Sequence, residues 1–219
     1  NLVRPDLGLR GTIDGEVTAQ GTAGQLTGDV GLTVSGLSAA ELSNRGIAPV
    51  DVRIDGSFAG GTFDLQRADV ALGGGTVSAS GSVGDALDLT VAARNLPLSL
   101  GNIASADLGL SGTLNAAARV TGSRDDPEAT FAARQQNASA AVLRSAGPLS
   151  ATVAGRFAAG TVTLSTATAS VAGGRIDATG RVGNTMDLSA VLTSMPLSLG
   201  DAFAPSLALR GRLSGRVAV

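Results

Sequence analysis

The chain has 219 residues and no Cys, His, Trp, Tyr or Lys; all 16 basic residues are Arg, and the formal net charge is −2. With 43% hydrophobic and 16% charged residues it is too apolar for a disordered chain, and its 31 Gly follow no collagen period. Scattered arginines and 2% aromatics argue against a nucleic-acid surface, and the usual catalytic bases and nucleophiles are missing. We expect a protein that is not an enzyme and binds no cofactor or metal.

Apolar and polar residues alternate along much of the chain, a pattern typical of β-strands with one apolar face. In residues 7–20 the odd positions are apolar or small and the even positions are mostly polar. We predict an all-β, mostly antiparallel sheet whose apolar face is lined by these side chains: Leu7, Leu9, Ile13, Val17, Leu32, Val34, Val52, Ile54, Phe58, Val77, Val83, Leu87, Leu89, Leu108, Leu110, Leu114, Val120, Val153, Phe157, Ile176, Val182, Leu188, Leu207, Leu209 and Leu213.

Glycine-rich turns separate the alternating stretches. Short pairs and triplets of this kind connect adjacent antiparallel strands, so they predict hairpins. They occur at Gly60–Gly61, Gly73–Gly75, Gly84–Asp85, Gly173–Gly174 and Gly183–Asn184.

Helical structure is expected only as short turns. One candidate runs from Ser38 to Asn44, with Ser38 as its cap, and two others follow Pro97 and Pro196. Each is too short to be a main element of the fold.

The chain repeats itself at an offset of 99 residues. Residues 50–120 and 149–219 align without a gap, and 25 of the 71 positions are identical. A shorter similarity, at an offset of 101, links residues 7–11 with 108–112. We predict one continuous array with a first repeat unit at 1–106, a second at 107–205 and the start of a third at 206–219. Repeats of this kind need neighbours to bury their faces.

Polar clusters are few, and we interpret them as solvated. Asp125–Glu128 could hold a cation, but an Asp-Pro pair is typical of a turn ahead of a strand. Gly73–Gly75 lacks the following Lys of a phosphate-binding loop. Arg10, Arg119 and Arg181 lie on the predicted polar face, where they could contact lipid headgroups or simply hydrate the sheet.

Several motifs together resemble the repeats of the TamB family, large proteins of Gram-negative envelopes that are related to AsmA-like proteins. In the first copy these are Leu96–Leu100, Leu108–Leu114, Val120–Ser123 and Asp126–Phe131. Met195–Pro205 and Leu207–Gly215 give the pattern again, and Leu7–Gly21 gives part of it. The first unit departs from the pattern, because 21–24 lacks the Asp-Pro pair.

The resemblance implies an elongated sheet curled into a U-shaped hydrophobic groove, similar to a folded taco. It implies a periplasmic position in a protein anchored to the inner membrane by a segment outside this chain. It also implies phospholipid transport between the two membranes and outer-membrane protein assembly with a partner of the Omp85 type. The expected ligands are therefore phospholipid acyl chains, and no nucleic acid is expected.

Two other functions stay open. The chain could be a structural or adhesive β-solenoid stalk of a secreted surface protein, whose apolar faces would close on each other as a dry core. Rungs of such stalks repeat every 20 to 25 residues, and we find only the longer period. The chain could also act mainly as a docking platform that offers an open sheet edge to an assembly partner.

Overall fold

The computed structural model describes residues 8–22, 25–39, 43, 48–103, 108–141, 147–202 and 209–219. Its strands form a single antiparallel sheet in which the strand order follows the chain. The all-β prediction is thus confirmed. The strands are β1 (Arg10–Thr22), β2 (Gln25–Ser38), β3 (Val50–Ala59), β4 (Thr62–Leu72), β5 (Gly75–Val83), β6 (Ala86–Pro97), β7 (Ser111–Ser123), β8 (Pro127–Ser139), β9 (Leu149–Ala158), β10 (Thr161–Val171), β11 (Gly174–Val182), β12 (Met186–Pro196) and β13 (Arg212–Ala218).

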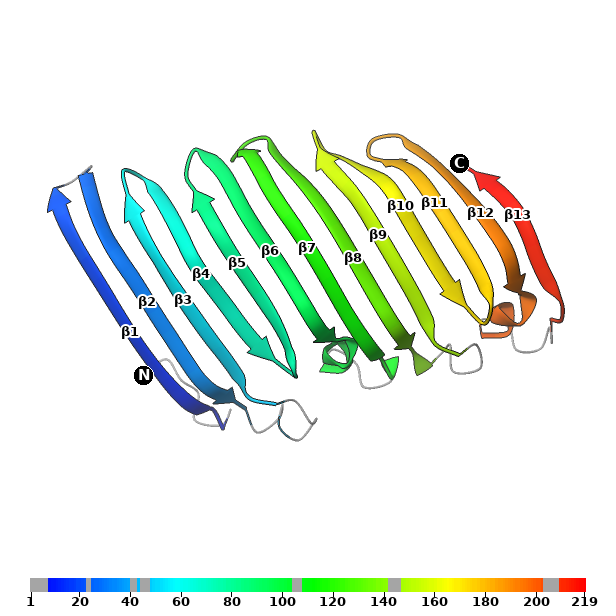
Figure 1. Cartoon of the computed structure of the whole chain (residues 1–219), viewed down its shortest axis with the longest axis horizontal. Coiled ribbons are helices and arrows are strands. Elements are labelled where there is room, and N and C mark those ends of the chain that lie inside the picture. The colour runs from blue at the N-terminus through cyan, green and yellow to red at the C-terminus, as the bar shows by residue number, and fades with distance from the viewer. Residues whose placement is uncertain are drawn as a thin grey trace. The chain divides into compact units, whose positions relative to one another are not determined.

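The chain divides into two compact units. Unit 1 holds residues 1–96 and 117–127, and unit 2 holds residues 97–116 and 128–219, so β7 contributes to both. Within each unit, strands that are consecutive in the sequence lie side by side (Figure 1). The predicted repeat boundaries near 106 and 205 lie outside the described residues and stay predictions.

Two-residue glycine turns close the hairpins as the sequence predicts. Gly60 and Gly61 join β3 to β4 with φ of 56° and 81°, and Gly73 and Gly74 join β4 to β5 with φ of 59° and 85°. Positive φ at both turn residues matches the twist of the flanking strands, which is why Gly is favoured here. Gly84 and Asp85 join β5 to β6, and residues 183–185, which include Gly183 and Asn184, join β11 to β12.

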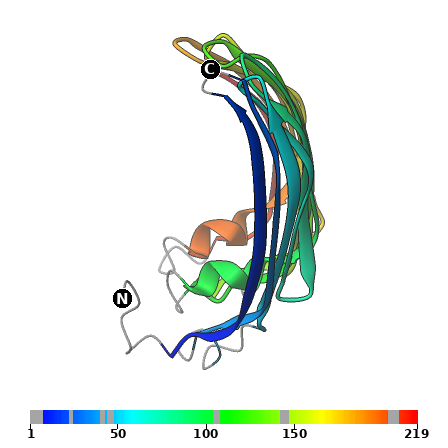
Figure 2. The same cartoon turned by 90° about the vertical axis from the view of Figure 1, so that its left-hand side faces the viewer.

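Bulges interrupt the pairing at equivalent places in the two units. In β4, Gln66 is an extra residue between the pairs Gly56–Leu65 and Asp55–Arg67. In β10, Ser165 is the extra residue, and its Oγ donates a hydrogen bond to the Ala154 carbonyl at 3.0 Å. A bulge bends its strand and increases the local twist. In unit 1, β1 and β2 bow along their length (Figure 2).

The repeat is visible in the strand boundaries. Strands β3, β4 and β5 begin and end 99 residues before β9, β10 and β11. Strand β1 has the bounds of β7 at an offset of 101. Identical sequence motifs therefore occupy equivalent places in the sheet.

Short 3-10 helices follow two of the strands. They are η2 (Leu98–Ile103) and η5 (Leu197–Ala202), so the helical turns predicted after Pro97 and Pro196 are confirmed. The predicted turn at 38–44 lies mostly outside the described residues. Within it, Ser38 ends β2, and the Ser43 N–H donates to the Ala39 carbonyl at 2.9 Å.

Candidate functional site

Strand register assigns the side chains of unit 1 to two faces. Residues directly opposite each other in an antiparallel pair lie on the same face. One row of such partners crosses β1 to β6 as Ile13, Val34, Val52, Val70, Val77 and Ala93, and the next row holds Gly15, Leu32, Ile54, Ala68, Ala79 and Val91. Two further rows hold Val17, Val30, Gly56, Leu65, Gly81 and Leu89, and Ala19, Gly28, Phe58, Phe63, Val83 and Leu87. We call the side that carries these rows the apolar face.

Unit 2 carries the same kind of face. Register places Phe131, Leu149, Val153, Phe157, Val162, Leu164, Val171, Ile176, Val182, Met186, Leu188, Leu192, Leu213 and Val217 together on one side of β8 to β13. Gln135 is a polar residue on this side, paired with Ala151. Its Nε2 donates to the Leu149 carbonyl at 3.0 Å, whereas its Oε1 is buried without a hydrogen-bond partner.

Most of the predicted face residues are brought together by the register. Leu9 lies before β1 and is exposed, and Leu108 lies before β7. Arg119 forms an ion pair with Asp88 on the polar side of β6, so its neighbour Val120 in β7 points to the apolar side. Leu114 is an even number of residues from Val120 in β7 and is assigned to the same side. The Leu110 backbone exchanges two hydrogen bonds with the Asn102 side chain. Leu7 and Leu207 lie outside the described residues.

Sequence reasoning missed several residues of the face. Leu26, Val30, Phe63, Leu65 and Val70 belong to unit 1. The bulge at Gln66 moves the apolar positions of β4 from odd to even numbers, which hides a strict alternation. The run Leu26, Gly28, Val30 was a usable signal that continued the pattern of Leu32 and Val34.

The apolar face is not covered by a second layer of the described residues. Only Val34 and Val171 among the described hydrophobic side chains are buried, each at 8% exposure, and no large side chain is fully buried. Ile13 and Val17 on the edge strand β1 are 69% and 68% exposed. Contiguous uncovered apolar surface of this kind is rare on soluble proteins and marks sites of interaction.

An open hollow of about 500 Å³ lies at one end of the apolar face of unit 1. Leu26, Phe58, Phe63 and Val83 line it together with Gly61 and Thr62 of the adjacent hairpin. Arg124, in the turn after β7, is the one charged residue among the described residues of the lining. The Arg124 N–H donates to the Asp85 carbonyl at 3.3 Å, which joins this turn to the one between β5 and β6.

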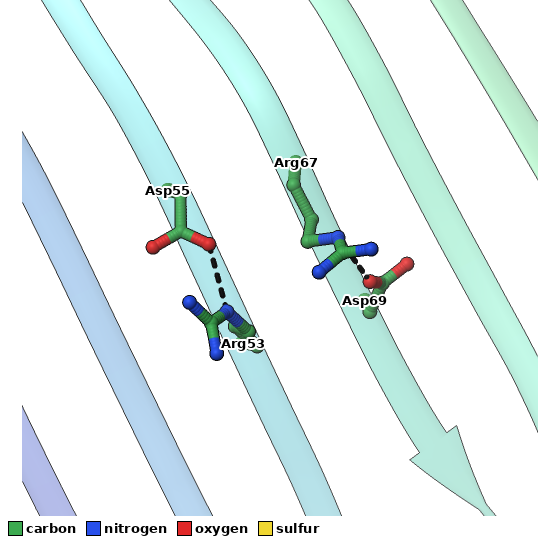
Figure 3. A network of polar contacts seen from close by, with 4 residues as sticks. All are labelled: Arg53, Asp55, Arg67 and Asp69. Atoms are coloured by element: carbon green, nitrogen blue, oxygen red, sulfur yellow. Dashed lines mark hydrogen bonds and ion pairs between the residues drawn. The ribbon is translucent and has the colours of Figure 1, made fainter.

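The opposite face is polar and carries ion pairs. Figure 3 shows Arg53 with Asp55 on β3 and Arg67 with Asp69 on β4; each Arg Nε lies 2.8 or 2.9 Å from its partner's Oδ2. Because Asp55 pairs with Arg67 and Arg53 with Asp69 across the strands, every neighbour in this group of four has the opposite charge. The hydrogen bond and charge of Asp55, with a smaller contribution from Asp69, raise the pKa of Arg53.

A further ion pair lies on the polar face of unit 2. Arg175 binds both carboxylate oxygens of Asp177 at 2.7 and 2.5 Å. The hydrogen bond from Arg175 lowers the pKa of Asp177, and desolvation opposes this only in part. The same contact raises the pKa of Arg175.

The acidic cluster at 125–128 is part of a turn and a strand. Glu128 in β8 forms an ion pair with Arg156 in β9, and the Asp126 N–H donates to Ser123 Oγ at 3.0 Å. Over the described ranges, no group of three or more acidic residues is placed to hold a metal ion.

No family model, curated protein or solved structure matches the chain.

The described residues contain no helix with the length and apolar character needed to cross a membrane. Among the described residues that the strand register places on the apolar face, Gln135 is polar and none is charged; Arg124 lies beside the hollow in unit 1. Such a surface can bind an apolar chain through dry contact and has little means of selecting a polar ligand.

Proposed function

We propose that this chain is a segment of a TamB-like periplasmic bridge protein whose apolar face carries the acyl chains of phospholipids between the inner and outer membranes. The observation that carries the proposal is the apolar face itself, which continues from strand to strand in each unit without a covering layer of described residues. The parent protein would be anchored in the inner membrane outside this segment and would also serve outer-membrane protein assembly.

The energetics favour acyl chains as the ligand. Burial of each methylene group stabilises a complex by about 0.8 kcal/mol, so a chain lying along a strand gains several kcal/mol without any hydrogen bond. The headgroup would stay in water at the edge of the sheet. Transport would be passive sliding, because a uniform apolar surface binds the acyl chain about equally well at successive positions.

The finer shape that we infer is a curled, U-shaped groove. The repeated bulges at Gln66 and Ser165 support it, because bulges bend and twist the strands that contain them. The glycines on the apolar face, such as Gly28, Gly56 and Gly155, would let the backbone curve tightly.

A second candidate role is a docking platform for an outer-membrane assembly partner of the Omp85 type. An exposed edge strand is a template for the addition of a strand from another protein. A stalk with a closed dry core is less consistent with the uncovered face.

Site-specific photo-crosslinking tests the transport proposal. A photoreactive phenylalanine analogue at Ile54 or Phe157 would face lipid on the apolar side, whereas Thr33 and Thr163 provide matched controls on the polar side of the same sheet. With the chain expressed in the periplasm of a Gram-negative bacterium, we expect mass spectrometry to detect phospholipid adducts at Ile54 and Phe157 but not at the two threonine positions. Equal labelling of both faces, or none at either, would contradict the proposal.

A further inference from the structure

The hollow at the end of unit 1 combines apolar walls with a cationic side chain, that of Arg124. Its walls include the side chains of Leu26, Phe58, Phe63 and Val83, which all lie on the apolar face. Its volume of about 500 Å³ falls in the range of small-molecule sites, about 300–1,000 Å³. The hollow therefore has room for part of an extended hydrocarbon chain.

Arg124 lies at the rim of this hollow without an ion-pair partner in the part of the chain that the structure describes. The arginines in ion pairs there are Arg53, Arg67, Arg119, Arg156 and Arg175. The Arg124 side chain is exposed, and the backbone rather than the guanidinium makes the hydrogen bond to Asp85. Its charge is thus available to a ligand, even though Asp125 and Asp126 follow it in the sequence.

The lining positions of the hollow differ in composition between the two units. At the offset of 99, Phe157, Thr161 and Val182 take the places of Phe58, Thr62 and Val83, but Val162 stands where unit 1 has Phe63. The cross-strand pair Phe58–Phe63 of unit 1 is thus a Phe157–Val162 pair in unit 2.

We infer that this hollow is a binding site for one anionic amphiphile, with its hydrocarbon chain against Phe58 and Phe63 and its anionic group on Arg124. The assignment rests on the proposed function, which supplies the acyl chain, and adds a selective position to an otherwise uniform surface. An arginine guanidinium suits carboxylate and phosphate equally well, since it presents a planar fork of donors. A fatty acid and an anionic phospholipid share this chemistry.

Fluorescence with a matched pair of probes tests the site in the 219-residue chain. Parinaric acid and its methyl ester have the same polyene chain and differ in charge, and the protein has no Trp or Tyr to interfere. We expect both probes to bind, and Arg124→Gln to weaken binding of the acid about fivefold while leaving the ester unchanged. Arg124→Lys should retain most of the affinity, and Arg181→Gln, on the polar face of unit 2, should leave both probes unaffected.

The outcomes separate this site from the general function. If neither probe binds, the proposed function fails and the site fails with it. If both bind but Arg124→Gln changes their affinities equally or not at all, the site alone is overturned. Competition with oleate and with an anionic lysophospholipid then identifies the source of the anionic group, and a failure of both to displace parinarate also overturns the site.

Discussion

The ring of Phe58 on β3 lies over Gly28 on β2, so close that a β-carbon at Gly28 would be 2.6 Å from Phe58 Cζ. The same arrangement recurs in both units. The Phe63 ring lies over Gly56, and the Phe131 ring lies over Gly155. A ring above a glycine covers backbone that would otherwise be exposed. Glycine is therefore required here for lack of space.

Substitution of Gly28 by Ala should destabilise the sheet. The new β-carbon would lie 2.0 Å from the Thr18 carbonyl oxygen as well as against the Phe58 ring, so backbone and ring must both shift. We expect a loss of about 1–3 kcal/mol, measured by urea unfolding. Gly31→Ala is the matched control on the same strand, because its nearest contact would be Asp55 Oδ1 at 3.9 Å. Equal effects of the two substitutions would contradict the packing argument.

The sequence predicted the parts of this fold that depend on local chemistry. Alternation at Val52, Ile54 and Phe58 gave the strand and its apolar side, and the glycine pairs gave the hairpins. The two bulges were not predictable, because Gln66 and Ser165 have no side-chain property in common that specifies an extra residue. Each bulge shifts the phase of the alternation, so the apolar residues around it were missed.

The hollow could not be predicted from the sequence either. Arg124 is some sixty residues or more from Phe58 and Phe63 along the chain, and only the sheet register and the Asp85 contact bring the turns together. The sequence does not distinguish the roles of the scattered arginines. These roles can be told apart only from the spatial neighbours, which are an ion-pair partner for Arg53 and an apolar hollow for Arg124.

The alternating charges on β3 and β4 should make the sheet sensitive to charge reversal. Asp55→Arg would place a third positive charge between Arg53 and Arg67, so we expect a lower melting temperature at low salt. High salt should reduce the difference, because these groups are exposed and screened. Adding Arg67→Asp should restore part of the stability, because it returns opposite charges to the cross-strand pair 55–67. Asp64→Arg is the control, since its cross-strand partners Ser57 and Ser82 are uncharged. A loss that is independent of salt would argue against an electrostatic origin.

The Arg175–Asp177 ion pair should be visible in the titration of the Asp177 carboxylate. Asp177 has a pKa below its ordinary value of 3.8 because Arg175 binds the carboxylate. Its folded pKa is depressed, so its contribution to stability is present above the unfolded pKa and is lost as the pH falls through the folded pKa. Carbon-detected NMR titration should show the Asp177 pKa rising toward the ordinary value in Arg175→Gln. Arg181→Gln, four residues from Asp177 on the same strand, should leave the Asp177 pKa unchanged. A shift of similar size in that variant would mean that the pKa responds to the general positive charge of the strand and not to the Arg175 contact.

The second unit should be stabilised by restoring the glycines of the first. Ala159 and Ala172 have φ of 47° and 49°, whereas the equivalent turn positions in unit 1 are Gly60 and Gly73. Left-handed backbone costs a residue with a β-carbon about 1–2 kcal/mol. Ala159→Gly should therefore raise the stability by about 1 kcal/mol and the melting temperature by about 2–4 °C, and Gly60→Ala should lower both by a similar amount. A β-carbon at Gly60 would meet nothing within 4 Å, so crowding cannot produce the loss. If Ala159→Gly is destabilising, the entropy of the unfolded chain rather than turn strain controls these hairpins.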